Sequence, residues 1–255
     1  MAGEGLASSI SHVFIDLDDT MYVNPVVPAI VKRRIIEYMT QRLAVPPDEV
    51  EKLCSDLHAE YGTTLCGLLA TGYDIDVEEW HQFVEGTLDY GKLIHRDPTL
   101  RDMLCRIQQP KYVFTNADYA HTQKCLQCLG VEDCFQGIVC FDSIQKLGQQ
   151  KGLADRSKVI CKPSPLAFEL GLEQTGAHAC TSVFVDDSQR NVAGARSVGM
   201  LSILVSDKGN PCHTGLAIRH IHEFPRVLPQ LFDCGSEREE LVIPNPIALM
   251  APSSS

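Results

Sequence analysis

The most constraining stretch of the sequence is VFIDLDDT at residues 13–20, where an apolar run leads directly into three carboxylates and a threonine. A short uninterrupted apolar run predicts a strand buried on both faces, as in a parallel sheet. Side chains two apart on a strand point the same way, so Asp16 and Asp18 can converge while Leu17 faces away. Clustered carboxylates repel one another and are costly to bury unpaired, so they need a cation or a water-filled cleft. The ordinary alternative is a polar turn that caps a helix.

Three later segments repeat the succession of an apolar or irregular run, polar residues and a helix. Strands that alternate with helices predict a parallel sheet covered on both sides and joined by right-handed crossovers. The carboxyl ends of such strands meet at one edge, where ligands bind near a switch in strand order. We therefore expect the polar residues of these segments to gather beside Asp16 and Asp18. They are Thr115, Asn116, Lys162, Asp186 and Asp187.

The periodicity of apolar residues predicts an α/β fold with a helical insert. Strands are expected at 12–17, 111–114, 137–141, 182–185 and 201–205, with an edge strand at 218–221. Before residue 110, intervals of three and four predict helices at 28–43, 46–62, 77–88 and 100–107. Later helices are expected to end at 129, 176 and 198, with a last one at 225–232, and residues 143–161 are expected to be irregular.

These elements predict two structural units. Residues 1–22 and 108–235 would form a Rossmann-like α/β core with a parallel sheet, and residues 23–107 an inserted, all-helical cap. The charged and then Pro/Ser-rich stretch at 236–255 is expected to be disordered.

Composition excludes several classes of partner. A net charge of −11 over 255 residues argues against nucleic acid and anionic membranes, since both attract a positive surface. The eleven cysteines show no disulfide framework, and the first residues lack the pattern of a signal peptide. We expect a cytoplasmic protein with free thiols. Cys125 and Cys128 form a C-x-x-C in a helical pattern and are interpreted as packing residues, with a zinc site as the alternative.

Together the strand-end residues predict a phosphate site. Asp16, Asp18 and an acid of the Asp186-Asp187 pair offer the oxygen ligands that Mg²⁺ prefers. Lys162 adds a positive charge, Thr115 a hydroxyl, and Asn116 a backbone N–H at a helix start. A carboxylate beside a phosphate can attack it to form an aspartyl phosphate. A second acid two residues on can protonate the leaving oxygen and later deprotonate water. This chemistry is phosphomonoester hydrolysis.

In this order the four segments resemble the signatures of the haloacid dehalogenase-like (HAD) phosphatases. The matching stretches are FIDLDDT at 14–20, VFTN at 113–116, Lys162, and VFVDD at 183–187. The resemblance implies a nucleophile at Asp16, a general acid/base at Asp18, and phosphate binding by Thr115 and Lys162. It also implies Mg²⁺ held by Asp16, the backbone carbonyl of Asp18 and Asp187, with Asp186 in a supporting position. Asn191 would support Asp187 or be an ordinary surface residue of its helix.

A narrower resemblance connects the chain with the pyrimidine 5′-nucleotidase-like proteins of fungi and plants, through DLDDTMY at 16–22, YGTTLCGL at 61–68 and FTNAD at 114–118. It implies a nucleoside monophosphate, of the UMP, CMP or XMP type, as the small-molecule partner. Phosphosugars and pyridoxal phosphate stay open, as does a homodimer. The cap must select the leaving group, and the candidates for this are Tyr22, Tyr61, Thr63 and Thr64. Tyr61 equally continues an apolar helix stripe.

Two alternatives are not enzymes. A response-regulator receiver also gathers acids, a threonine and a lysine around Mg²⁺, but it is about half this length and has no long helical insert after its first strand. The acid at Asp18 also fits hydrolysis better than a lasting phosphorylated state. An inactive HAD-like scaffold would lack one of the expected catalytic residues, and this chain has all of them.

Overall fold

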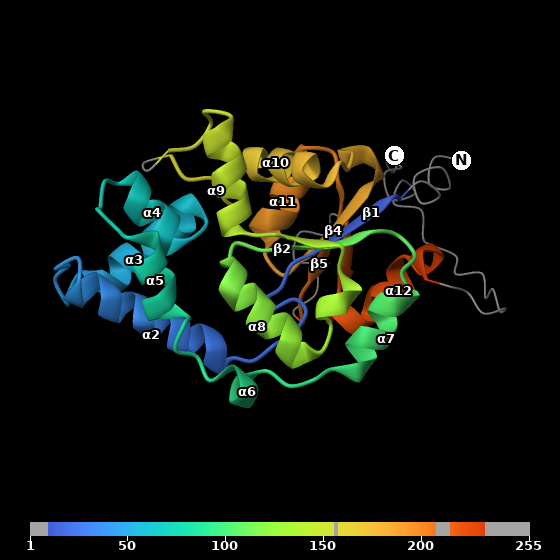
Figure 1. Ribbon diagram of the computed structural model, residues 1–255, viewed down its shortest axis with the longest axis horizontal. Coiled ribbons are helices and arrows are strands. Elements are labelled where there is room, and N and C mark those ends of the chain that lie inside the picture. Colours follow the sequence, from blue (N-terminus) through green and yellow to red (C-terminus); the bar gives the residue numbers. More distant parts are fainter. Residues whose placement is uncertain (1–9, 156–157, 208–214, 233–255) are drawn as a thin grey trace, which may run out of the picture.

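The computed structural model describes residues 10–155, 158–207 and 215–232 (Figure 1). Their centre is a six-stranded sheet in the order β3-β2-β1-β4-β5-β6, with every neighbouring pair parallel. Continuous apolar runs form the inner strands because both faces of a parallel sheet are covered. The strands are β1 His12–Ile15, β2 Lys111–Phe114, β3 Gly137–Val139, β4 Ser182–Asp186, β5 Leu201–Val205 and β6 Leu216–Ile218.

The strand order reverses at β1. From β1 the chain runs to β2 and β3 on one side, and then continues with β4, β5 and β6 on the other. Ile15 therefore lies opposite both Val113 of β2 and Val185 of β4. Connections that leave a parallel sheet in opposite directions open a crevice at the carboxyl ends of the central strands. The residues that follow Ile15 lie at this switch point.

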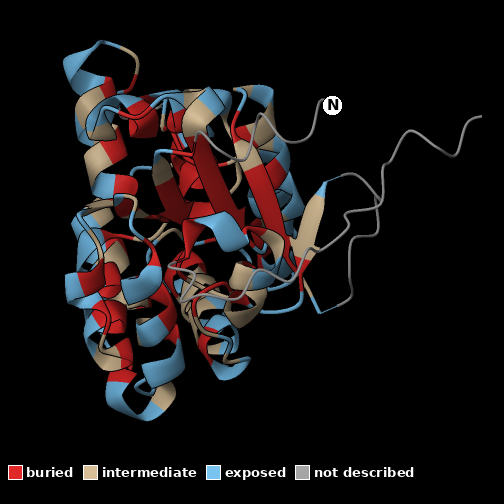
Figure 2. Ribbon diagram, turned by 90° about the vertical axis from the view of Figure 1, so that its right-hand side faces the viewer, coloured by how far each residue is buried: buried red, intermediate tan, exposed pale blue. Residues whose placement is uncertain are grey.

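Helices cover both faces of the sheet, and the strands bury side chains alternately on each. Val13 and Ile15 belong to one hydrophobic cluster and Phe14 to another, as the two-residue period of a strand requires. Figure 2 shows the inner strands buried and a strand of intermediate burial at one edge of the sheet, with exposed residues on the outer faces of the helices. The first cluster involves α7 Pro98–Arg106, α8 Tyr119–Leu129 and α12 Phe224–Val227, and the second α9 Phe141–Gln150, α10 Pro165–Thr175 and α11 Gln189–Ser197.

A separate helical body stands beside the sheet, on the left of Figure 1. Its helices share a hydrophobic cluster that includes Met39, Leu57 and Trp80 and that extends to Phe141 and Cys161 beyond the helical body. They are α2 Val26–Gln41, α3 Val50–Tyr61, α4 Thr64–Ala70 and α5 Val77–Val84.

The return segment from this body, with α6 Tyr90–Leu93, packs with the sheet. Leu88, Ile94 and Leu100 belong to the same cluster as Val13 and Ile15. This packing favours an end to the cap before residue 107, and the division at residues 22 and 107 stays a prediction.

Most predicted elements are confirmed, and the exceptions have local causes. The stretch 143–161 was expected to be irregular, but α9 occupies its first part because Phe141, Ile144 and Leu147 form an apolar helix face. The helix α4 is not apparent in the sequence because six of its seven residues are buried, which leaves no polar face to give a period. The edge strand is β6, which begins two residues and ends three residues earlier than expected. The predicted tail at 236–255 lies outside the described residues.

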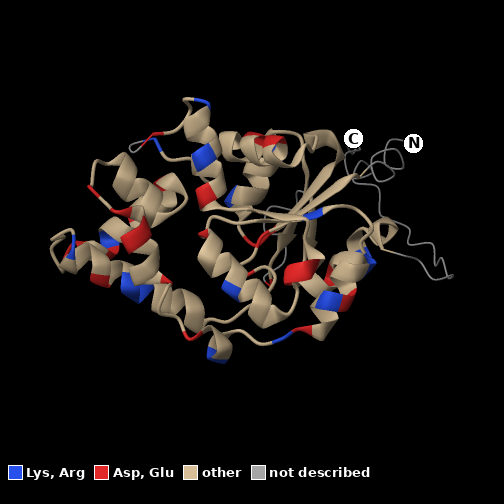
Figure 3. Cartoon of the chain, in the orientation of Figure 1, with Lys and Arg blue, Asp and Glu red and all other residues tan. Residues whose placement is uncertain are grey.

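Charge and helix lengths add two observations. Lys and Arg are scattered among Asp and Glu over the helices of both parts of the chain (Figure 3). Within the described ranges, no helix combines the length and the apolarity needed to cross a bilayer.

Candidate active site

Lys162 occupies the centre of the switch point. Its ammonium group donates hydrogen bonds to Asp16 Oδ1 at 2.7 Å, to Asp186 Oδ2 at 2.8 Å and to the carbonyl of Phe114 at 2.6 Å. The side chain is 1% exposed, so burial opposes its charge, but the two carboxylates outweigh that effect and the pKa of Lys162 is raised. The lysine is fully charged and joins the ends of β1, β2 and β4.

Both carboxylate oxygens of Asp186 already accept hydrogen bonds from groups of the protein. Besides Lys162, its carboxylate accepts hydrogen bonds from the backbone N–H of Ser188 at 2.8 Å and from Asn191 Nδ2 at 3.0 and 3.1 Å. The prediction that Asn191 supports Asp187 is therefore wrong. Asn191 lies one turn into α11, which directs its amide back to the end of β4 and to Asp186.

Among the described residues, Asp16 and Asp187 are the acids of this cluster with carboxylate oxygens that have no hydrogen-bond partner in the protein. Carboxylate oxygens of Asp16, Asp186 and Asp187 lie within 4.8 Å of one another. Burial raises the pKa of Asp16 against the pull of Lys162, and burial together with Asp186 and Asp19 raises the pKa of Asp187 to about 7. Carboxylates that resist ionisation next to one another are stabilised by a cation. The donor set consists of hard oxygens, which fits Mg²⁺.

The loop after Asp16 ties the first acidic segment to the last. Asp19 has a left-handed backbone (φ 58°) that turns the chain toward the helical body, as expected for a residue that shapes the turn. Thr20 is buried, and its hydroxyl accepts a hydrogen bond from the backbone N–H of Asp187 at 3.1 Å. The carboxylates that follow β1 and β4 are thereby held side by side.

Asp18 is held by groups that the sequence pattern did not indicate. Its Oδ1 accepts a hydrogen bond from Tyr22 Oη at 2.5 Å and lies 2.9 Å from His121 Nε2. Burial raises the pKa of Asp18, but the charge and the hydrogen bonds of His121 and Tyr22 more than offset it, so the pKa is lowered. Burial lowers the pKa of His121, and Asp18 raises it to well above its usual value. The two side chains form an ion pair.

The segment after β2 positions both the site and the lysine. Thr115 is buried, lines the cavity, and accepts a hydrogen bond from the N–H of Ala117 at 3.1 Å. Asn116 also lines the cavity, and both polar atoms of its side chain bond to the backbone of Lys162. Phosphate binding by the backbone N–H of Asn116 stays a prediction.

A cavity of about 420 Å³ joins these residues to the helical body. Asp16, Asp18, Thr115 and Lys162 line one end. The other end is formed by side chains from the cap and by Phe141 of α9. The principal cap residues there are Val31, Ile35, Thr63, Thr64, Leu65, Trp80, His81, Val84 and Glu85.

The four predicted substrate-selecting residues are placed differently from one another. Thr63 and Thr64 line the cavity, but the hydroxyl of Thr63 caps α4 by accepting from Cys66 N–H, and that of Thr64 faces α3. Tyr61 is outside the lining of this cavity and packs against the apolar cluster of the cap. Tyr22 bonds to Asp18 instead. Selection by these residues stays a prediction.

Several residues in or next to the cavity had no signal in the sequence. His81 and Glu85 are two ordinary polar residues of α5, and His121 is a single histidine in the apolar pattern of α8. His81 Nδ1 lies 3.2 Å from Asp118 Oδ2, across the boundary between the two parts of the chain. Only the folded chain brings these pairs together. The spacing of His81 and Glu85, one helical turn, was the one available clue.

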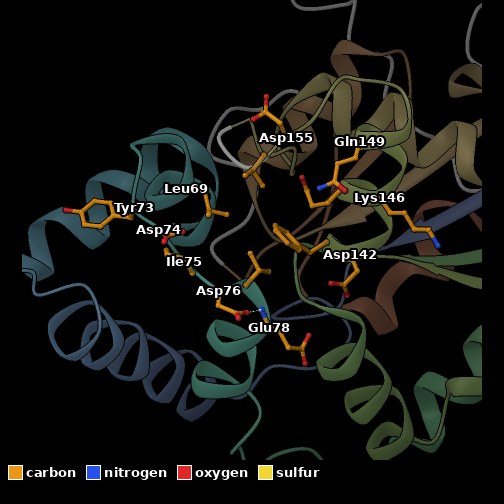
Figure 4. A pocket seen from close by; sticks show the side chains of 14 residues that line it. Leu69, Tyr73, Asp74, Ile75, Asp76, Glu78, Asp142, Lys146, Gln149 and Asp155 are labelled. Atoms are coloured by element: carbon orange, nitrogen blue, oxygen red, sulfur yellow. Dashed lines mark hydrogen bonds between the residues drawn. The ribbon is translucent and has the colours of Figure 1, made fainter.

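A second cavity, of about 470 Å³, lies between the α4–α5 segment and α9 (Figure 4). It is slightly larger but contains none of the strand-end residues. Asp76, one of its acids, is already used to cap α5 through the backbone N–H of Glu78. The chemistry of the molecule is concentrated in the other cavity.

Fold and site define an α/β enzyme with a lysine-bridged acidic site at the switch point of a parallel sheet. The chain belongs to the haloacid dehalogenase-like hydrolase family, whose model matches residues 10–199. A curated relative is Phosphate metabolism protein 8 of Saccharomyces cerevisiae, which is 28% identical over 196 residues. The match covers 73% of this chain and 59% of the yeast protein, so the chain spans less than two thirds of its relative.

Solved structures agree with the fold. The HAD phosphatase of Thermococcus onnurineus superposes with a TM-score of 0.57 at 18% identity, over 86% of this chain and 98% of that one. The L-2-haloacid dehalogenase of Xanthobacter autotrophicus has a TM-score of 0.51 at 14% identity, with the same coverage. The HAD-hydrolase YfnB of Bacillus subtilis, bound to magnesium, has a TM-score of 0.54 at 16% identity, again with the same coverage. At these identities the comparison shows the HAD fold.

Proposed function

We propose that the protein is a Mg²⁺-dependent phosphomonoesterase that hydrolyses a nucleoside 5′-monophosphate through an aspartyl phosphate on Asp16. The observation that carries this proposal is the meeting of Asp16, Asp18, Thr115 and Lys162 in one cavity. Mg²⁺, when bound by Asp16, Asp187 and the carbonyl of Asp18, supplies charge that offsets repulsion between the carboxylates and the phosphate. Asp186 is then a supporting group, since its oxygens are already bonded.

The residues of the chain account for both halves of the reaction. In the first, an oxygen of Asp16 attacks phosphorus, the bond to the leaving oxygen breaks, and Asp18 gives that oxygen its proton. The approach of a phosphate dianion favours the protonated form of Asp18. In the second, Asp18 takes a proton from water as the water attacks the aspartyl phosphate, which releases phosphate and regenerates Asp16. Lys162 holds the carboxylate of Asp16 in position during both steps.

The need for a proton distinguishes this reaction from dehalogenation, which other proteins of the same fold perform. A halide leaves as a stable anion and requires no acid, whereas the alkoxide of a sugar leaves poorly unless it is protonated. Asp18 borders the same cavity as the nucleophile and supplies such an acid. The name of the yeast relative, which refers to phosphate metabolism, also supports phosphate ester hydrolysis.

The nucleotide substrate rests on the size and lining of the cavity and on the resemblance to nucleotidases. A space of about 420 Å³ admits a nucleoside, and Val31, Ile35 and Trp80 provide apolar surface for a base. Pyridoxal phosphate and phosphosugars are the alternative substrates. A cytoplasmic location and a homodimer belong to the same proposal.

A phosphate-release screen tests the proposal. The substrates are UMP, CMP, XMP, pyridoxal phosphate, a phosphosugar and 4-nitrophenyl phosphate, each with Mg²⁺ or with EDTA. We expect release from at least one nucleotide, its loss in EDTA, and its loss in Asp16→Asn. Full activity of Asp16→Asn would overturn the mechanism. Hydrolysis of 4-nitrophenyl phosphate without hydrolysis of any nucleotide would overturn the substrate class.

A further inference from the structure

One carboxylate oxygen of Asp18, Oδ1, has two hydrogen-bond partners. Tyr22 Oη donates to Oδ1 at 2.5 Å, from the turn that leaves the site, and His121 Nε2 lies 2.9 Å from the same atom, from α8. No hydrogen bond to Oδ2 is found among the described residues, and Asp18 lines the cavity with a side chain that is 39% exposed. The carboxyl group therefore has one anchored oxygen and one oxygen available to a substrate.

His121 is itself held in place. Its side chain is 2% exposed, and Nδ1 lies 3.0 Å from Tyr90 Oη. That hydroxyl also donates to the carbonyl of Glu85 at 3.1 Å, so toward His121 it serves as an acceptor. The backbone N–H of His121 bonds to Asp118, the residue that caps α8. The ring cannot turn without breaking its contacts with Tyr90 and Asp18.

A metal centre is the alternative interpretation of the cluster of Asp18, His121 and Cys125, because each of these residues offers a ligand atom. Two ligands of a tetrahedral zinc ion at about 2.0–2.2 Å lie about 3.3 Å or more apart. His121 Nε2 and Asp18 Oδ1 lie closer than this, at a hydrogen-bond distance, with Tyr22 on the same oxygen. The group is therefore arranged as a hydrogen-bond network.

We propose that His121, assisted by Tyr22, is a positioning residue that fixes the carboxyl group of Asp18 so that its free oxygen meets the leaving oxygen of the substrate. This rests on the proposed role of Asp18 as general acid and base. Acid catalysis depends on such placement, because the proton must travel along a short, aligned path. His121 makes no contact with the substrate. Its removal impairs proton delivery while leaving the attack by Asp16 intact.

The choice of substrate separates positioning from a merely structural role. An alkyl phosphomonoester such as a nucleotide needs the proton, whereas 4-nitrophenolate leaves without one. Because Asp18 also takes the proton from water when the aspartyl phosphate is hydrolysed, the two substrates are compared in the first half of the reaction, by release of the leaving group with enzyme in excess. For His121→Phe we expect this rate to fall by about 10²-fold on the nucleotide and to change by about threefold or less on 4-nitrophenyl phosphate. His121→Gln retains an N–H near the position of Nε2 and is expected to recover a large part of the loss.

The rates on the nucleotide and on 4-nitrophenyl phosphate are measured on one preparation and compared as a ratio. A fraction of unfolded protein lowers both equally and does not change this ratio. Tyr22→Phe removes only a hydroxyl and is expected to shift the ratio in the same direction by a smaller factor. His222→Gln is the matched control, because His222 Nε2 also lies 2.9 Å from a carboxylate, that of Asp97, outside the site. It should leave the ratio unchanged.

Equal losses on both substrates in His121→Phe would overturn the proposal, and so would a His121→Gln variant no better than His121→Phe. Failure of the proposed function gives a different result. If the wild-type protein hydrolyses another alkyl phosphate but no nucleotide, the substrate class is wrong and the ratio is measured with that ester. If it hydrolyses no phosphomonoester at all, the proposed function and this proposal fall together.

Discussion

Asn116 and Lys162 hold each other by a pair of reciprocal hydrogen bonds. Asn116 Nδ2 donates to the carbonyl of Lys162, and Asn116 Oδ1 accepts from the backbone N–H of Lys162, each at 2.9 Å. The contact joins the end of β2 to the residue before Pro163. It fixes the backbone from which the ammonium group reaches Asp16 and Asp186.

Asn116→Ala should therefore impair the function of Lys162, although Asn116 contacts the backbone of Lys162 and not its ammonium group. Loss of two partly buried hydrogen bonds is expected to cost about 1–3 kcal/mol of stability. A misplaced Lys162 no longer offsets the charge of Asp16, so kcat/KM should fall by about tenfold or more. Chemical denaturation and steady-state kinetics measure the two effects. A stable variant with unchanged kinetics would show that the lysine needs no such support.

Gly62 allows the cap to approach the same lysine. It has φ +90°, and a Cβ at this position would lie 2.4 Å from the carbonyl oxygen of Lys162. Gly62→Ala combines backbone strain of about 1–3 kcal/mol with a displacement of the Lys162 backbone, so we expect losses of both stability and kcat.

Gly72 provides the matched control for this contact. It has φ +91° but nothing within 4 Å of the added Cβ, so Gly72→Ala carries the strain without the clash. We expect it to lower the melting temperature while retaining activity. Equal activity of the two variants would mean that the approach of the cap to Lys162 is unimportant.

The strands and the central site were predictable because they depend on local pattern and on topology. An apolar run followed by polar residues predicts a strand and its functional end, and a parallel sheet brings such ends together. Asp16, Thr115 and Asp186 were found in this way, whereas Lys162 follows a segment expected to be irregular and was singled out by its place at the start of a helix.

The surroundings of the site were not predictable, because the partners come from distant elements. His121 and Asp18 are 103 residues apart, and each has an ordinary role in its own segment, one on an apolar helix face and one in a turn. Asn191 lies on the expected helix, but the direction of its side chain decides between Asp186 and Asp187, and that direction depends on tertiary structure. The sequence pattern therefore predicts the helix or strand on which a residue lies, whereas its hydrogen-bond partner depends on how these elements pack.

Protons should compete with Mg²⁺ at Asp187. The pKa of this carboxyl group is raised to about 7 by burial and by Asp186 and Asp19, so below that pH the metal-free site is protonated. Metal binding must then release a proton, and the Mg²⁺ concentration for half-maximal activity should rise about tenfold per pH unit below pH 7 and level off above it.

Titrations of activity with Mg²⁺ between pH 5.5 and pH 8.5, a range of about one and a half units around the pKa, measure this dependence. Asp187→Asn has no proton to release and should bind Mg²⁺ weakly at every pH, without the slope. A wild-type protein with the same half-maximal concentration across the range would contradict a role for Asp187 as a metal ligand.

His81 should make the contact between cap and core sensitive to pH. Burial lowers the pKa of His81, but the charges of Glu85, Asp118 and Asp142 outweigh it and the pKa is raised. A raised histidine pKa stabilises the folded state fully below the unfolded value of about 6.5, and this contribution is lost as the pH rises through the folded-state pKa. His81→Gln should therefore lower the melting temperature at pH 5.5 by a few degrees, about 2–4 °C for a pair worth about 1 kcal/mol, and by less at pH 9. The difference between wild type and variant, measured by thermal denaturation across this range, isolates the histidine from the other titrating groups. A difference that stays constant or grows with pH would show that His81 is neutral in the folded protein.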